Sequence, residues 1–106
     1  VQLHTLDVRS KDQIAALADD PTIRKLDLLI HSAGINQGSF DVQRRINAEA
    51  PFEVINAMLP RLQASRHPRV CVVTSNMGTE AQVKHQRRKG LTSSIYVYAL
   101  TKLMAN

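Results

Sequence analysis

The chain has 106 residues, of which 43% are hydrophobic and 22% charged, a composition typical of one soluble globular domain. Its single cysteine excludes an internal disulfide framework, and its four scattered histidines lack the spacing of a metal site. The net charge is +5, and removing Lys84, Arg87, Arg88 and Lys89 would leave +1. Such a local run is typical of a solvated loop, with contact to a phosphate or an acidic partner as the alternative.

Three segments have the pattern of β-strands. Val1–Val8 alternates apolar and polar residues, which predicts a strand that ends near Asp7. Leu26–Ile30 and Val70–Thr74 are continuous apolar runs, as in parallel strands that are buried on both faces. Cys71 lies inside the last run, and we expect it to be a small buried hydrophobic residue.

Three further segments have helical periodicity. Ser10 is a candidate N-cap for a helix over Lys11–Ala18. Apolar residues recur at three- and four-residue steps over Val42–Ala64, where Pro51 interrupts the pattern. Ser94–Asn106 has the same kind of periodicity, which predicts a third helix.

The alternation of strands and helices predicts an α/β fold with a parallel sheet. Ligands bind such sheets at the carboxyl ends of the strands, where Asp7, Ser32-Ala33-Gly34 and Ser75 are expected to meet. The polar segment Asn76–Ser93 is expected to be a long loop that is mobile without a ligand, because structureless loops of this length are usually lids or disordered.

Tyr98 and Lys102 are four residues apart, so a helix would place them on one face. A phenol ordinarily titrates near pH 10 and needs a nearby cation to act as an acid or base at neutral pH. Tyr96 lies about 200° around the helix from Tyr98 and does not share this face. The alternative interpretation is an ordinary surface pair of tyrosine and lysine.

Two more residues are candidates for chemistry. Ser75 ends a predicted strand, where its hydroxyl can bind a substrate oxygen, or it is a simple turn serine. Because Pro51 has no N–H, the main-chain carbonyl of Asn47 loses its helical partner and can bind a water molecule. The alternative for Pro51 is a helix that is merely kinked. His31 is expected to be a packed or capping residue and not a catalytic one.

In this order, the motifs resemble those of the short-chain dehydrogenase/reductase family, and most of all its carbonyl-reductase-like and C-factor-like members. The matching stretches are Leu6-Asp7-Val8, Leu29-Ile30-His31-Ser32-Ala33-Gly34, Arg45-Ile46-Asn47, Val73-Thr74-Ser75-Asn76-Met77-Gly78 and Tyr98-Ala99-Leu100-Thr101-Lys102. The chain departs from the family in three ways, one of which is that the stretch from Ser75 to Tyr98 is longer than the family's shortest form. His31 and Ser32 stand where the family has two asparagines, and the glycine-rich phosphate turn is absent because the chain begins at what would be the third strand.

The resemblance implies a Rossmann-like, doubly wound sheet, of which residues 1–106 would form the central part with the family's strands three to five. It implies an NAD- or NADP-dependent enzyme that reduces a carbonyl or oxidises a secondary alcohol. The implied catalytic residues are Asn47, Ser75, Tyr98 and Lys102, with Tyr98 as the acid or base. The implied cofactor-binding residues are Asp7, Val8, His31, Ser32, Ala33, Gly34, Tyr98 and Lys102. For Asp7 the alternative is a simple turn residue before a helix.

The resemblance also implies a small-molecule substrate, a homodimer or homotetramer for the full-length protein, and a cytoplasmic location, without nucleic-acid or membrane partners. One alternative is a truncated or inactive member that acts only through association of its helices over 42–64 and 94–106. Nucleic-acid binding through residues 84–89 is the weakest alternative, because only 4% of the residues are aromatic and the positive charge lies in one run.

Overall fold

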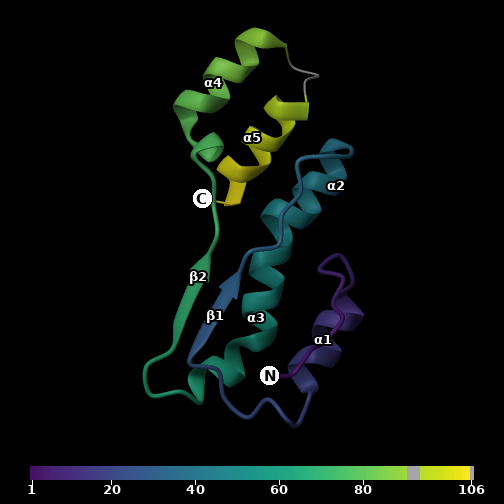
Figure 1. The fold of residues 1–106 in the computed structure, drawn as a ribbon, viewed down its shortest axis with the longest axis vertical. Helices are drawn as coiled ribbons and strands as arrows, with labels where there is room; N and C mark the ends of the chain where they lie inside the picture. Colours follow the sequence, from purple (N-terminus) through teal and green to yellow (C-terminus); the bar gives the residue numbers. More distant parts are fainter. Residues whose placement is uncertain (91–93, 106) are drawn as a thin grey trace.

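A computed structural model describes residues 1–90 and 94–105 of the chain. The sheet among these residues has two strands. Figure 1 shows it beside a long helical segment, with α4 (Glu80–Lys89) and α5 (Ser94–Ala105) gathered at one end of the molecule. The first helix, α1 (Lys11–Asp19), begins where the sequence predicts, because the Ser10 side chain accepts a hydrogen bond from the Gln13 amide. This bond satisfies one of the amide groups that lack a partner in the first turn.

Strands β1 (Leu28–His31) and β2 (Arg69–Val72) pair in parallel, with Leu29 opposite Val70. The Val73 amide donates to the His31 carbonyl at 2.9 Å, which extends the pairing by one residue beyond β2. The parallel α/β architecture predicted from the alternation of strands and helices is therefore confirmed.

Only one face of the sheet is covered by the described helices. The core comprises Ile14, Leu29, Val54, Met58 and Leu62, from α1, β1 and the helix α3 (Ala50–Gln63). On the other face Ile30 is 60% exposed, and Cys71 in β2 is also exposed. The expectation that both strands and Cys71 are buried on all sides is wrong, because no described helix packs on this second face.

The first eight residues do not form a strand. Val1 and Leu3 are exposed, and Leu6 packs at the border of the core. A strand needs a neighbour that pairs with its N–H and C=O groups, and among the described residues this segment has none. The prediction of a strand over Val1–Val8 that ends near Asp7 is therefore wrong. The sheet that the structure describes has two strands.

The periodicity over residues 42–64 becomes one continuous helical segment made of α2 (Phe40–Arg44), the π-helical turn η1 (Arg45–Glu49) and α3. The Ala50 amide donates to the carbonyl of Arg45, five residues back. This wider turn comes immediately before Pro51, whose ring would clash with the preceding turn of a regular helix and whose missing N–H cannot pair with Asn47. The predicted interruption thus takes the form of a π-turn within the helix.

The predicted loop over residues 76–93 is wrong in its larger part. It contains a 3₁₀ turn, η2 (Asn76–Gly78), and a ten-residue helix, α4 (Glu80–Lys89), whereas 91–93 lie outside the described residues. The Thr79 hydroxyl caps the helix by accepting from the Gln82 amide, and Lys84 forms an ion pair with Glu80 at 2.6 Å. Basic residues in the last turn further favour a helix, because they complement its dipole.

Candidate active site

A cleft of about 700 Å³ opens where both strands end, beside the helix α5 (Ser94–Ala105). The segments that follow β1 and β2 both contribute to it, as the parallel topology predicts. The residues that line the cleft are Ser32, Gly34, Ile35, Asn36, Gln37, Gly38, Val73, Thr74, Tyr98 and Lys102.

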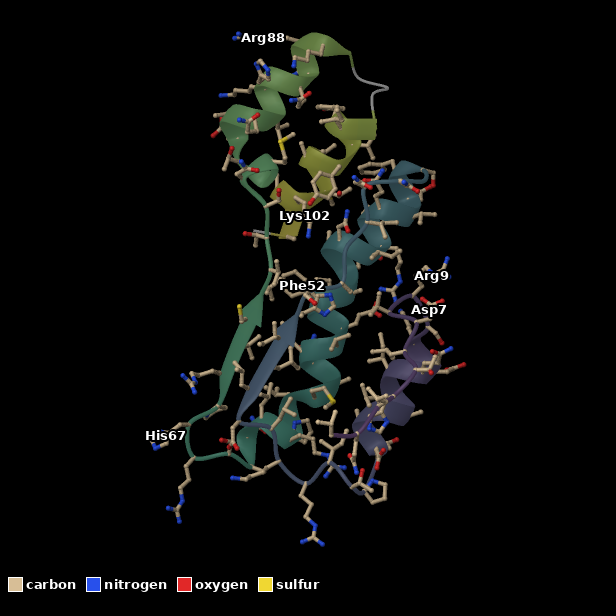
Figure 2. All side chains as sticks on the ribbon, viewed as in Figure 1. Asp7, Arg9, Phe52, His67, Arg88 and Lys102 are labelled. Atoms are coloured by element: carbon tan, nitrogen blue, oxygen red, sulfur yellow. The ribbon has the colours of Figure 1, made fainter. Side chains whose placement is uncertain are left out.

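Tyr98 and Lys102 both line the cleft, and the Lys102 ammonium lies 5.9 Å from the centre of the Tyr98 ring. Figure 2 shows Lys102 at the end of α5 that approaches the strands. Lys102 is only 6% exposed, and its Nζ donates to the Val73 carbonyl at 3.3 Å. An ammonium has three N–H groups, and no carboxylate of a described residue pairs with this one. Lys102 can therefore donate to a molecule bound in the cleft.

Two glycines allow the chain to approach Lys102 closely. A Cβ atom on Gly34 would lie 3.1 Å from the Lys102 Nζ and 3.3 Å from the Asn47 Oδ1. A Cβ atom on Gly78, in η2, would lie 2.8 Å from both the carbonyl carbon and the carbonyl oxygen of Lys102. Gly78 belongs to one of the family-like stretches, but its contact with Lys102 was not predicted, because Lys102 lies 24 positions further along the chain.

The side chain of Asn47 is 1% exposed and bridges to the loop after β1. Its Oδ1 accepts from the Ile35 amide at 2.8 Å, and its Nδ2 donates to the Ile35 carbonyl at 2.7 Å. Nδ2 also donates to the Thr101 hydroxyl at 3.0 Å. Asn47 is thus tied both to a segment that lines the cleft and to α5, which carries Tyr98 and Lys102.

Ser75 lies immediately after the cleft-lining Thr74 and is half-buried. Its hydroxyl accepts from the Met77 amide at 3.2 Å and so caps η2. The O–H of the same hydroxyl can still donate to another group. The role of Ser75 as a ligand of a substrate oxygen stays a prediction.

His31, Ala33 and Val8 are not among the residues that line this cleft. They line a second, more apolar cavity of about 460 Å³ beside β1, which shares Ser32 with the cleft. His31 is 6% exposed, and among the described residues its Nε2 has no hydrogen-bond partner. Burial, and to a lesser degree the charge of Lys102, lowers the pKa of His31 below its ordinary value. The neutral ring therefore leaves an unpaired ring nitrogen beside this cavity.

Asp7 is not brought to the cleft. Figure 2 shows it with Arg9 at the edge of the molecule, apart from Lys102. Its carboxylate accepts from the Arg9 guanidinium at 2.8 Å and from the Arg9 amide at 2.9 Å. The side-chain bond to Arg9 is the main cause that lowers the pKa of Asp7 to about 2. Asp7 therefore forms the turn before α1, and its contact with a cofactor stays a prediction.

The comparisons with known proteins agree with this arrangement. Dehydrogenase/reductase SDR family member 13 of Bos taurus and of Homo sapiens are each 33% identical over 98 residues, which cover 84% of this chain. A solved structure from Burkholderia multivorans, named as a short-chain alcohol dehydrogenase, matches 99% of the chain with a TM-score of 0.77 and 21% identity. A 7α-hydroxysteroid dehydrogenase complexed with NADH and 7-oxo glycochenodeoxycholic acid matches 93% with a TM-score of 0.70 and 19% identity. No family model matches.

The curated relatives that the chain matches are members of the short-chain dehydrogenase/reductase family, and the chain has the Rossmann-like α/β fold of the matching solved structures. The chain spans 25% of the length of the curated relatives, and 50% and 39% of the two solved structures.

Among the residues described, no group of His, Cys, Asp or Glu is arranged to hold a metal ion. No helix within the described part of the chain is long and apolar enough to cross a membrane.

The residues that are present fit one half of the dinucleotide that the family implies. Lys102 offers unused N–H donors beside Tyr98, and Gly34 leaves room next to both Lys102 and Asn47. The unpaired Nε2 of His31 marks a second place where a buried donor or acceptor lacks a partner. These groups suit hydroxyls and a polar ring, whereas the glycine-rich turn that would bind the pyrophosphate is not among the 106 residues.

Proposed function

We propose that the full-length protein is an NAD(P)-dependent oxidoreductase that reduces a carbonyl or oxidises a secondary alcohol. The observation that carries this proposal is the pairing of Tyr98 with the buried Lys102 in a cleft at the carboxyl ends of two parallel strands. An acid or base beside a fixed cation is the arrangement that carbonyl reduction requires of the protein. The similarity of the chain to members of a family of dehydrogenases and reductases supports the same function.

In the direction of reduction, the bound dinucleotide would supply the hydride to the carbonyl carbon. Tyr98 would donate its phenolic proton to the carbonyl oxygen, so its O–H bond breaks and the O–H bond of the alcohol forms. The Lys102 ammonium would stabilise the phenolate that remains, because the opposite charge is close and screened from water. Ser75 would hold the substrate oxygen through its free O–H.

The proton on Tyr98 must be restored after each turnover. The Lys102 Nζ and the Asn47 Oδ1 both lie close to Gly34, and the main-chain carbonyl of Asn47 cannot pair with Pro51. We propose that the Lys102 ammonium first gives a proton to the Tyr98 phenolate. A water molecule at the Asn47 carbonyl, in exchange with solvent, would then restore the proton on Lys102. Asn47 would thus act through its main chain, while its side chain holds the loop after β1.

The experiment is a titration of the full-length protein with NADH and NADPH, followed by assays of dinucleotide-dependent reduction over a panel of carbonyl compounds. Saturable binding is expected with one or both dinucleotides. Lys102→Ala is expected to weaken that binding and to lower the rate of reduction, because the phenolate loses its stabilising cation. Lys25→Ala, which changes an exposed lysine, is the matched control. Failure of the wild-type protein to bind either dinucleotide would overturn the proposal.

Association of the full-length protein into a dimer or tetramer is part of the same proposal. Phe52 and Leu59 on α3 are 61% and 43% exposed. Large exposed apolar side chains on one helix are typical of an association surface.

A cytoplasmic location is also proposed, since the exposed and unpaired Cys71 suits a reducing compartment.

A further inference from the structure

Thr101 lies between the two residues of the proposed catalytic pair, and its side chain is fully buried. Its hydroxyl accepts a hydrogen bond from the Asn47 Nδ2 at 3.0 Å. The same hydroxyl donates to the main-chain carbonyl of Tyr98 at 3.0 Å, one turn earlier in α5. One oxygen atom therefore links the π-turn η1 to the helix that carries Tyr98 and Lys102.

The bond to Tyr98 alone would not distinguish this residue, because threonine side chains often bond to a carbonyl three or four positions back in their own helix. The bond to Asn47 is different, since it joins residues 54 positions apart and lies wholly in the interior. Asn47 is in turn held on both sides of Ile35, whose backbone lines the cleft. The result is a buried chain of bonds from the loop after β1, through η1, to α5.

We propose that Thr101 is a positioning residue: its hydroxyl sets where α5 stands relative to η1 and so fixes Tyr98 and Lys102 against the cleft. This inference rests on the proposed function and names a residue beyond the proposed catalytic set. Its physical basis is that Asn47 has both N–H groups of Nδ2 committed, one to Ile35 and one to Thr101. A side chain without an acceptor at position 101 would leave one of these N–H groups buried and unpaired, and such a group drives a local rearrangement.

The experiment compares Thr101→Val with Thr101→Ser in the full-length protein. Valine matches the shape of threonine but cannot accept from Asn47, whereas serine keeps the hydroxyl. Thr101→Val is expected to lower kcat for carbonyl reduction by about 10- to 100-fold, since a displacement of about 1 Å can cost about 10²-fold. Thr101→Ser is expected to stay within about threefold of the wild type. If Thr101→Val does not fold, Thr101→Ala takes its place as the variant without a hydroxyl.

A second readout does not depend on turnover. The Ile35 amide donates to the Asn47 Oδ1, so its hydrogen exchange reports whether Asn47 stays in place. We expect this amide to lose protection when the hydroxyl is removed and to keep it in Thr101→Ser. If the wild-type protein proves inactive but the Ile35 amide shows this pattern of protection, the proposed function is wrong. The structural role of the hydrogen bond between Asn47 and Thr101 is then still supported.

Two results would overturn the proposal. One, given an active wild-type protein, is an equal kcat in the variants with and without the hydroxyl. The other is unchanged protection of the Ile35 amide when the hydroxyl is removed.

Discussion

Lys102 is the residue whose environment is hardest to explain by stability alone. Its side chain is almost fully buried, yet its described acceptor is one main-chain carbonyl at 3.3 Å. Burying an ammonium without a paired charge is costly, so such groups concentrate at sites where they act on a ligand. The glycines at positions 34 and 78 remove the side chains that would otherwise displace it.

The burial of His31 predicts that the free energy of unfolding depends on pH. Its pKa is lowered in the folded protein, mainly by burial, so the unfolded chain takes up the proton first as the pH falls. The free energy of unfolding is therefore expected to decrease as the pH drops below the unfolded value of about 6.5 towards the lower folded value. In the full-length protein, His31→Asn should flatten this decrease, as measured by urea denaturation at pH 7.5 and pH 5.5.

The control for this measurement is His67→Asn, which removes an exposed imidazole. It should leave the pH dependence close to that of the wild type. A wild-type curve and a His31→Asn curve with the same slope between these pH values would contradict the assignment of His31 as a neutral, buried ring.

Among the elements, the short turn η2 can pack closely against α5 because Gly78 has no side chain. Gly78→Ala would bring a methyl group to 2.8 Å from the Lys102 main chain, closer than real contacts allow. We expect a loss of about 1–3 kcal/mol in the free energy of unfolding. We also expect weaker dinucleotide binding, because Lys102 must shift. Chemical denaturation of the full-length protein and its fluorescence titration with NADH or NADPH measure the two effects.

Asn76→Ala, in the same turn at an exposed position, is the matched variant and should affect neither quantity strongly. A Gly78→Ala protein that matches the wild type in both stability and binding would show that η2 can move without disturbing Lys102.

The sequence predicted those elements and residue pairs whose causes are local. The N-cap of Ser10, the parallel strands and the pairing of Tyr98 with Lys102 all follow from neighbouring residues or a fixed helical spacing. The helix α4 was missed because its polar and basic residues lack an apolar stripe, and its cap at Thr79 was overlooked. The bond between Asn47 and Thr101 leaves no trace in the sequence, since it joins distant segments whose separation depends on packing.

At the scale of the whole molecule, the chain is elongated, with extents of 49 × 26 × 21 Å and a radius of gyration of 15.6 Å. A globular domain of this length has a radius of gyration of about 13 Å. Its accessible surface of 7165 Å² likewise exceeds the roughly 5,900 Å² of a folded protein of this mass. The excess includes apolar side chains on the open face of the sheet, such as Leu28 and Ile30.

The 106-residue chain by itself is therefore expected to lack a cooperative thermal transition and to show no saturable dinucleotide binding. The open sheet face and the unpaired first segment leave too little apolar surface buried to offset the entropy of ordering the chain. Circular dichroism melting and a dinucleotide titration of the purified chain test this. A sharp melt together with saturable binding would contradict it.

The most direct test of the central claim is single-turnover reduction of a carbonyl substrate by the full-length protein with Tyr98→Phe. This change removes the phenolic proton and keeps the ring, so the packing of α5 and dinucleotide binding should hardly change. The rate of reduction is expected to fall by about 10²–10⁴-fold, the contribution of a general acid or base. Tyr96→Phe, on another face of the helix, should be nearly silent. Wild-type turnover in Tyr98→Phe, or a damaging effect of Tyr96→Phe, would contradict the assignment of Tyr98 as the proton donor.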